Sequence, residues 1–264
     1  MAVVESNLGT AEVLLEARGL QKSFGAVRAL QHADLRLLAG SVTALVGDNG
    51  AGKSTLVRCL TGVHPPDRGE LLLRGEEVHF SSPEACRALG VETVYQNLAL
   101  IEDLPVWQNL YLRRELLKGK GPFSILDKRA MRDRAADILK ELDVNIPSIR
   151  SNVRRMSGGQ RQSIAIARAA HWGEQLVVMD EPTAALGVRE TAAVEQLVMR
   201  LRDRGVTVLL ISHDMAQVKR IADTVVVLRS GRTVARRAVS ETSPDDLVAL
   251  ITGAQEGDVG DPAA

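Results

Sequence analysis

The sequence has no excess of charge of either sign. Its 33 lysine and arginine residues balance 33 aspartate and glutamate residues, so the formal net charge of the 264-residue chain is zero. Proteins that bind nucleic acid through a broad basic face need a surplus of positive charge, so no nucleic-acid partner is expected. The remaining composition, 45% hydrophobic and 25% charged, is that of an ordinary globular protein.

Cysteines are few and long apolar runs are absent. Cys59 and Cys86 lack the spacing of a metal site and are too few for a disulfide framework, so we expect reduced thiols in a cytosolic protein. No stretch approaches the ~18 uninterrupted apolar residues of a membrane helix. The first residues, MAVVESNLGTAEV, lack the basic and then apolar layout of a signal peptide. If the protein works at a membrane, another chain must supply the membrane span.

The first part of the chain is dominated by short strand-like runs, from Val13 to about Phe80. One helix interrupts them, beginning at Gly52 after the apolar run SVTALVG. Arg74-Gly75-Glu76 has the composition of a tight hairpin turn. Residues 1–12 and the Gly/Asp/Ala-rich residues 254–264 are predicted to be flexible tails.

The middle of the chain changes to a helical pattern, from about residue 105 to 155. One predicted helix has Asp127 as its N-cap, and its apolar face consists of Met131, Ala135, Ile138, Leu139 and Leu142. After Ser157, continuous Val/Leu/Ile strands alternate with helices, which indicates a parallel sheet buried on both faces. We therefore predict an α/β fold with an antiparallel β portion and a helical subdomain at about residues 97–160.

A glycine-rich segment follows the apolar run SVTALVG. Residues 47–55, GDNGAGKST, fit the phosphate-loop pattern, in which backbone N–H groups and a helix N-terminus surround a phosphate. Lys53 is predicted to reach the β- and γ-phosphates, and the Ser54 hydroxyl to ligate Mg²⁺. The predicted ligand is Mg-ATP, held by Gly47, Asn49, Gly50, Gly52, Lys53, Ser54 and Thr55.

A second apolar run, QLVVMDEP, ends in two carboxylates. In an open α/β sheet the chemistry lies at the carboxyl ends of the strands. We expect Asp180 to contribute to holding Mg²⁺ and Glu181 to orient the attacking water, the division of roles that phosphoryl transfer needs. Alone, such a strand end is commonplace and would be interpreted as a simple turn.

Two further polar residues follow predicted strands. His213 comes after VTVLLIS, and Gln96 lies within ETVYQNLALIEDLP. By itself, a histidine at a strand end is usually a solvated or capping residue, and a lone glutamine there is even weaker evidence of a function. Both gain meaning only from the motif at residues 154–170.

The segment RRMSGGQRQSIAIARAA, residues 154–170, resembles the signature sequence of ATP-binding-cassette (ABC) proteins, with Met156 in place of the usual leucine. The matching residues are Ser157, Gly158, Gly159 and Gln160. The resemblance implies a phosphate-loop ATPase with a RecA-like core over residues 13–253. It also implies that two such domains stack head to tail, so that each signature turn caps the γ-phosphate held by its partner.

The family pattern assigns further roles to this chain between Leu14 and about Arg237. Phe24 matches the aromatic residue that stacks on adenine, Gln96 the glutamine that senses Mg²⁺, and His213 the histidine that contacts the γ-phosphate. The implied partners are a second ATPase subunit, forming a homodimer, and membrane-spanning permease subunits that dock beside Gln96, with a solute-binding protein acting indirectly. The implied location is peripheral, on the cytoplasmic face of the inner membrane.

Gly187 departs from the family pattern, and three other segments resemble one group within the family. The family usually has an aspartate at the position of Gly187, which links the two ATP sites. The segments GDNGAGKST, DEPTAALGVRET and VALITGA are similar to those of the ribose, xylose and fructose importers. Many of those proteins carry two cassettes in one chain, whereas this chain has one.

Three functions are compatible with these motifs. The first is the ATPase of an importer, for which Leu98, Leu100 and Ile101 are predicted to form an apolar docking surface for the permease. The second is a soluble cassette ATPase that acts on ribosomes or DNA, against which the balanced charge and the lack of tandem cassettes or basic arms argue. The third is a nucleotide-binding regulator without turnover, against which Glu181 and His213 argue. The sequence favours the first.

Overall fold

The computed structural model describes residues 12–119, 124–255 and 257. In this part of the chain, strands in the order β5-β4-β1-β2-β12-β11-β3-β10-β9-β6 form one ten-stranded sheet, and β7 and β8 form a separate pair. The strands are β1 (Val13–Phe24), β2 (Val27–Leu38), β3 (Val42–Val46), β4 (Arg68–Leu73), β5 (Glu76–Glu77), β6 (Val91–Val94), β7 (Leu117–Lys118), β8 (Ile125–Leu126), β9 (Leu176–Asp180), β10 (Thr207–Ile211), β11 (Thr224–Arg229) and β12 (Arg232–Ala238). The α-helices are α1 (Lys53–Leu60), α2 (Pro83–Ala88), α3 (Val106–Leu110), α4 (Lys128–Glu141), α5 (Gly158–Trp172), α6 (Val188–Asp203), α7 (Met215–Ile221) and α8 (Pro244–Thr252).

The centre of the sheet is parallel and buried. Strands β11, β3, β10, β9 and β6 run in one direction, and every residue of β3 and β10 is buried. Strands covered on both faces require such continuous apolar sequences. The register pairs Ile211 of β10 with Leu45 of β3 and with Asp180 of β9. The carboxyl ends of these three strands therefore lie at one edge of the sheet.

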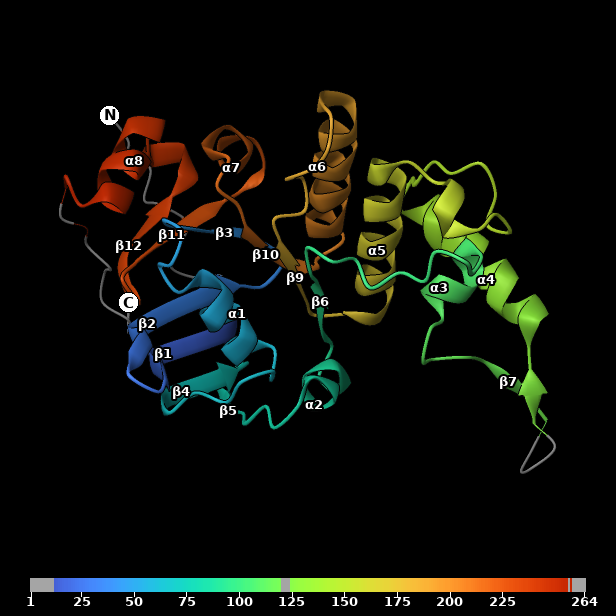
Figure 1. Cartoon of the computed structure of the whole chain (residues 1–264), viewed down its shortest axis with the longest axis horizontal. Helices are drawn as coiled ribbons and strands as arrows, with labels where there is room; N and C mark the ends of the chain where they lie inside the picture. The colour runs from blue at the N-terminus through green and yellow to red at the C-terminus, as the bar shows by residue number, and fades with distance from the viewer. Residues whose placement is uncertain (1–11, 120–123, 256, 258–264) are drawn as a thin grey trace.

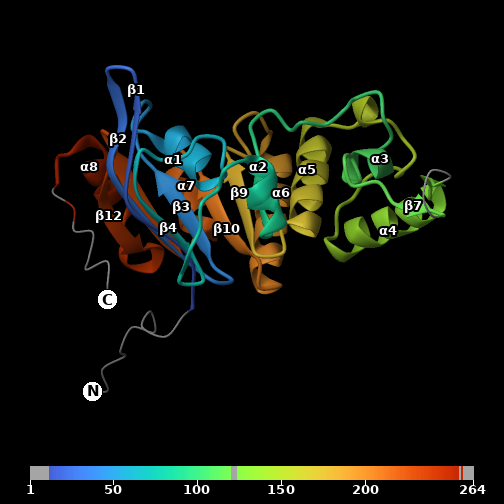
Figure 2. The ribbon, with the colours of Figure 1, turned by 90° about the horizontal axis from the view of Figure 1, so that it is seen from below.

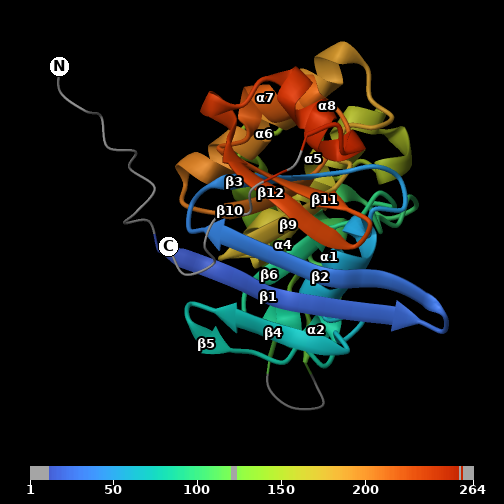
Figure 3. The ribbon, with the colours of Figure 1, turned by 90° about the vertical axis from the view of Figure 1, so that its left-hand side faces the viewer.

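The other half of the sheet is antiparallel. Strand β1 pairs with β2 and β4, and the β4–β5 hairpin turns through Arg74 (φ +52°) and Gly75 (φ +80°), which confirms the predicted tight turn. Figure 3 shows β1, β2 and β4 side by side in front of the parallel strands. The last strand in the described part of the chain, β12, pairs antiparallel with β11 and joins this half to the parallel core. The sequence pattern predicts antiparallel strands only in the N-terminal part of the chain, so the antiparallel pairing of β12 was not predicted.

Alternating residues of the parallel strands pack into different apolar clusters. Leu45 and Leu209 pack with α1 and the antiparallel strands, whereas Val208 and Leu210 pack with α5 and α6. Residues of β3 and β11 also pack with α7 and α8. Figure 1 shows α1 on one side of the sheet and α6, α7 and α8 on the other. Burying a Leu or Val side chain contributes about 1.5–3 kcal/mol, so these clusters account for much of the stability of the core.

The segment predicted to be helical from about residue 105 to 155 is only partly so. It contains α3, α4 and the short 3₁₀ helix η2 (Val153–Arg155), but β7 and β8 separate α3 from α4. Helix α3 ends at Leu110, and Gly119, just after β7, has a φ of +103°, which is open to glycine and rarely to other residues. Asp127 is the N-cap of α4, where its carboxylate accepts a hydrogen bond from the Ala130 N–H, as predicted. The predicted apolar face of this helix is buried.

In Figures 1 and 2, α3, α4 and β7 lie beyond α5, at the end of the molecule away from β1 and β2. This arrangement agrees with a separate helical subdomain, whose limits at about 97 and 160 remain a prediction. The two predicted tails lie almost wholly outside the described residues. Glu12, the first residue described, is already held, because its carbonyl accepts a hydrogen bond from Ala39 and its carboxylate pairs with Arg74.

Candidate functional site

The turn between β3 and α1 has the backbone geometry that a phosphate loop requires. Gly47 has a φ of +152°, and a Cβ added there would lie 2.1 Å from the Leu228 carbonyl oxygen. Gly52 has a φ of +105°, and its Cβ would lie 2.7 Å from the Ala29 carbonyl oxygen. Only glycine fits at these two positions. Gly52 is the N-cap of α1, so the helix begins at Lys53, one residue later than predicted.

Lys53 points back into this turn. Its ammonium group donates hydrogen bonds to the carbonyl oxygens of Gly47 (2.6 Å) and Asp48 (3.0 Å), and the residue is buried. Ser54 is exposed beside it at the start of α1. A cation enclosed by a glycine turn at a helix N-terminus is suited to binding a phosphate chain.

The two carboxylates of the second motif lie next to this turn, as the strand register requires. Burial raises the pKa of Asp180, the neighbouring Glu181 charge raises it further, and the Lys53 charge opposes the shift. Glu181 has a φ of +49°, a left-handed conformation that costs about 1–3 kcal/mol for a residue other than glycine. Its backbone N–H donates to the carbonyl of Ile211, which fixes the acidic pair against the end of β10.

His213 lies against the acidic pair. Its Nδ1 is 3.3 Å from Oε1 of Glu181, and the imidazole is 66% exposed, so it can still reach a ligand. The preceding Ser212 belongs to a small buried network, in which its hydroxyl pairs with Gln217 and the Gln217 amide donates to Thr183. This network joins the loop that carries His213 to the loop that follows Glu181.

Gln96 and Phe24 are both exposed near the ends of strands. Gln96 is exposed two residues after β6, the strand that pairs with β9 beside Asp180. Phe24 ends β1 and is 43% exposed, with its ring edge-to-face against His64 at 5.3 Å. This exposure rules out a core role for Phe24 and leaves its ring available to stack on a base.

The signature segment begins α5. Ser157 is the N-cap, its hydroxyl accepts a hydrogen bond from the Gln160 N–H, and the Gln160 side chain accepts one from the Ser157 N–H. Met156 is buried in the core, where an apolar residue is needed. Ser157 and Gly158 are exposed, whereas Gly159 is buried. The turn is thus a helix N-terminus open on one side, the geometry of an anion-binding turn.

The structure brings the phosphate loop, the acidic pair and His213 together but leaves the signature turn apart. Figures 1 and 2 both place α1 and α5 on opposite sides of β9. Among the described residues, no hydrogen bond or ion pair joins residues 157–160 to residues 47–55. One chain therefore carries two separate turns of the kind that can bind a phosphate.

The apolar docking surface expected at residues 98–101 is wrong in part. Leu98 and Leu100 are half-buried against the core, and of the three only Ile101 is exposed (44%). A single sequence cannot tell whether such residues pack inward or face a partner. Beside them lies a cavity of about 590 Å³, lined by Tyr95 and Ala99 after β6 and by Arg168 and Trp172 of α5.

Arg168 was not recognised in the sequence. Its guanidinium group donates hydrogen bonds of 2.9 Å to the carbonyl oxygens of both Leu98 and Ala99, so it holds the segment after Gln96 against α5. No sequence signal distinguishes such a residue from any other arginine on a helix.

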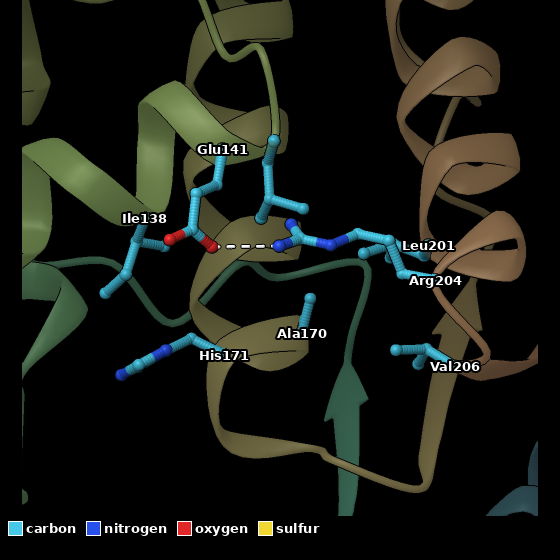
Figure 4. Close-up of a pocket in the computed structure, with 8 residues that line it drawn as sticks. Ile138, Glu141, Ala170, His171, Leu201, Arg204 and Val206 are labelled. Carbon is cyan, nitrogen blue, oxygen red and sulfur yellow. Dashed lines mark hydrogen bonds and ion pairs between the residues drawn. The ribbon is translucent and has the colours of Figure 1, made fainter.

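A smaller cavity of about 160 Å³ lies between α4, α5 and α6. An ion pair between Glu141 and Arg204 spans it at 2.9 Å (Figure 4). Ile138 and Val206 line it together with other residues of the helix packing. It contains none of the predicted site residues.

The chain matches one protein-family model and many known proteins. The model described as "ABC transporter" matches residues 30–184. The xylose/arabinose import ATP-binding protein XylG of Sulfolobus acidocaldarius is 42% identical, and the fructose import ATP-binding protein FrcA of Rhizobium meliloti 45% identical, each over 93% of this chain and 96% of its own length. The ribose import ATP-binding protein RbsA of Rhodopirellula baltica is 39% identical over 92% of this chain but only 47% of its own length.

Solved structures agree on the fold. The ADP conformation of MJ1267, an ATP-binding cassette of an ABC transporter, has a TM-score of 0.77 at 23% identity and covers 91% of this chain and 95% of its own. The dimeric structure of MJ0796, a bacterial ABC transporter cassette, has a TM-score of 0.70 at 22% identity over 86% of this chain and 99% of its own. These matches confirm the predicted α/β phosphate-loop fold. Within the part of the chain that the structure describes, no helix has the length and apolar character needed to cross a bilayer.

Proposed function

Because the chain belongs to the ABC transporter family of ATPases, we propose that it is the ATP-binding and ATP-hydrolysing subunit of a sugar importer. The observation that carries this proposal is the assembly of Lys53, Asp180, Glu181 and His213 at one sheet edge, with a second anion-binding turn at Ser157 on the same chain. The similarity to import ATP-binding proteins for xylose, arabinose and fructose supports the sugar assignment. It also favours import over action on ribosomes or DNA.

The first part of the proposed mechanism is the binding of the triphosphate. The turn from Gly47 to Gly52 leaves space that a Cβ would fill, so its N–H groups can approach phosphate oxygens closely. Lys53 then exchanges its carbonyl partners for the β- and γ-phosphates. Ser54, Asp180 and Gln96 offer the oxygen ligands that suit Mg²⁺, which, when bound, neutralises phosphate charge. Phe24 stacks on the adenine ring.

The second part is the positioning of water. Glu181 is fixed by its backbone hydrogen bond to Ile211, so its carboxylate can accept a hydrogen bond from a water molecule in line with the γ-phosphate. His213 lies 3.3 Å from that carboxylate, and in this mechanism its imidazole contacts the γ-phosphate. Positioning and charge neutralisation supply most of the catalysis in phosphoryl transfer.

The third part is the shared site. Since Ser157 and Gly159 lie apart from the phosphate loop of their own chain, we propose a head-to-tail homodimer in which they cap the γ-phosphate bound by the partner. Neither site is then complete in a monomer, and ATP holds the two subunits together.

The last part concerns the membrane. We propose that a permease docks in the cavity beside Gln96, where Ile101 and the residues held by Arg168 meet α5. The chain then lies peripherally on the cytoplasmic face of the inner membrane, and a solute-binding protein delivers the sugar to the permease from the other side. The sugar itself never touches this subunit.

Dependence on protein concentration tests the shared site. Hydrolysis per chain should rise with protein concentration, because only dimers hydrolyse ATP. Mixing Lys53→Ala chains with Ser157→Arg chains should restore activity from two inactive parents, since some mixed dimers contain one intact site. Constant activity per chain at concentrations where sedimentation shows a monomer would exclude the mechanism.

A charge placed on the docking face tests the permease contact. Ile101→Glu should keep the basal ATPase rate and lose stimulation by the reconstituted permease. Leu100→Glu is unsuitable, because Leu100 packs against the core. Val248→Glu is the matched control, since Val248 is an equally exposed apolar residue (50%) on α8. Stimulation of the reconstituted complex by pentoses or hexoses, but not by amino acids, tests the substrate class.

A further inference from the structure

A carboxylate of the same chain lies on the signature turn. Glu190, in the first turn of α6, accepts a hydrogen bond through Oε1 from the Gly159 N–H at 3.3 Å. Through Oε2 it accepts one from the Gly187 N–H, also at 3.3 Å. The pKa of Glu190 lies below its usual value, because the Ser157 side chain and the N–H groups of Gly187 and Gly159 stabilise its charged form, Ser157 contributing most.

The contact depends on the glycine at position 159. A Cβ there would lie 2.7 Å from Cβ and 2.8 Å from Cγ of Glu190, so any other residue would push the glutamate away. Glu190 covers Gly159, which is buried although Ser157 and Gly158 beside it are exposed. Glu190 binds the Gly159 N–H and is stabilised by the Ser157 side chain. The shared-site mechanism assigns these same two groups to the partner's γ-phosphate.

One anion must therefore leave before another can bind. A carboxylate and a γ-phosphate cannot share two donors, because each N–H or O–H proton forms one strong hydrogen bond and the two negative charges repel at contact distance. We propose, resting on the proposed function, that Glu190 occupies the γ-phosphate position of the signature turn in the free subunit and is displaced by the partner's ATP. Glu190 thus opposes ATP-dependent dimer formation, because the partner's ATP must displace it from each signature turn.

The surroundings of Glu190 allow this displacement. The hydrogen bond from the Gly187 N–H goes to the other carboxylate oxygen, so it does not depend on the bond to Gly159. Glu190 also lines a hollow of about 230 Å³ that contains Arg189 and Arg200, toward which the released carboxylate can turn. Gly187 carries no side chain, so the family's usual carboxylate at that position does not compete for the same donors.

The test is ATP-dependent dimer formation in a Glu181→Gln background, which binds ATP without hydrolysing it. Sedimentation velocity gives the protein concentration for half-dimerisation at saturating Mg-ATP, and binding of a fluorescent ATP analogue to dilute monomer reports the phosphate loop alone. Glu190→Ala should lower the half-dimerisation concentration by about tenfold, since each site loses a competitor held by charge-assisted hydrogen bonds. Analogue binding should not change.

Glu190→Gln is the second variant, because it keeps the shape of the side chain and its bond to Gly187 while removing the charge. It should shift dimerisation in the same direction by a smaller factor. Glu174→Gln, at an exposed glutamate after α5, is the control and should behave like the parent.

Two results would overturn the proposal. If both Glu190 variants dimerise as weakly as the parent or more weakly, with unchanged analogue binding, the carboxylate supports the turn and does not compete for it. If the parent Glu181→Gln protein fails to dimerise with ATP at any concentration, the shared-site function is itself wrong and the inference falls with it. A tighter dimer in the Glu190 variants than in the parent supports both.

Discussion

Replacement of Asn109 should destabilise the protein more than any exposed polar substitution near the site. Asn109 is completely buried, and its side chain binds the backbone of the preceding segment at several points. Its Oδ1 accepts from the Ile101 N–H at 2.7 Å, and its Nδ2 donates to the Ile101 carbonyl at 3.0 Å. The same amide donates more weakly to the carbonyls of Leu104 (3.2 Å) and Pro105 (3.3 Å).

The expected magnitude follows from these bonds. Each buried hydrogen bond contributes about 1 kcal/mol, and an unpaired buried group costs about 1–3 kcal/mol, so Asn109→Ala should lose roughly 2–4 kcal/mol. For a domain of this size each kcal/mol lowers Tm by about 2–4 °C, which gives a decrease of roughly 5–15 °C. Asn109→Asp should be at least as harmful, because a carboxylate oxygen would then face three carbonyl oxygens in a buried place.

Thermal unfolding followed by circular dichroism measures this effect. Gln108→Ala is the control, because Gln108 is the neighbouring half-buried residue on α3 and its side chain forms no hydrogen bond within the described structure. We also expect Asn109→Ala to weaken stimulation by the permease, since the segment at Ile101 loses its support. If Asn109→Ala lowers Tm by less than about 2 °C, or if the Asn109→Asp protein is as stable as wild type, the reasoning is refuted.

The remaining predictions concern the ATP site and the thiols. Glu181→Gln should keep ATP affinity and lower phosphate release about 100-fold or more, because the water loses its orienting carboxylate; a wild-type rate would remove Glu181 from the chemistry. Phe24→Ala should raise KM for ATP by roughly fivefold, about 1 kcal/mol of stacking, with little change in kcat, and an unchanged KM would contradict stacking. Burial raises the pKa of Cys59 to about 11 and that of Cys86 to about 12. Both thiols should therefore resist alkylation at pH 8 until the protein unfolds. Folding raises these thiol pKa values above the unfolded value of about 9, so the thiols stabilise the native state most at pH values below 9. The free energy of unfolding, measured with urea, should therefore fall as the pH rises from about 9 toward 11.

Local chemistry explains what the sequence predicted correctly. Gly47, Gly52 and Lys53 form a phosphate loop because their backbone and charge act within a few residues of one another. The Asp127 cap is equally local, since its carboxylate accepts a hydrogen bond from the N–H three residues ahead. The α/β core could be predicted because a strand buried on both faces needs an unbroken apolar sequence.

Contacts between distant segments explain what the sequence did not predict. Glu190 meets Gly159 across 31 residues, and Arg168 meets Ala99 across 69. No periodicity records such pairs, because each partner fits its own helix or turn equally well without the other. Strand β12 was missed for a different reason. Its sequence RTVARRA is rich in arginine, so it lacks the apolar run of the parallel strands.

Helix α5 connects the signature turn at Ser157 with the segment after Gln96. Its 15 residues form a helix about 22 Å long, which follows Ser157 directly. Near its other end, Arg168 forms hydrogen bonds to the segment after Gln96. About 16 Å of this helix separate Arg168 from Ser157, so a tilt of about 10° about Arg168 would move Ser157 by roughly 3 Å. This displacement is about the length of a hydrogen bond. If a permease docks in the cavity beside Gln96 as proposed, we therefore expect its contact with this segment to shift Ser157 relative to the partner's phosphate.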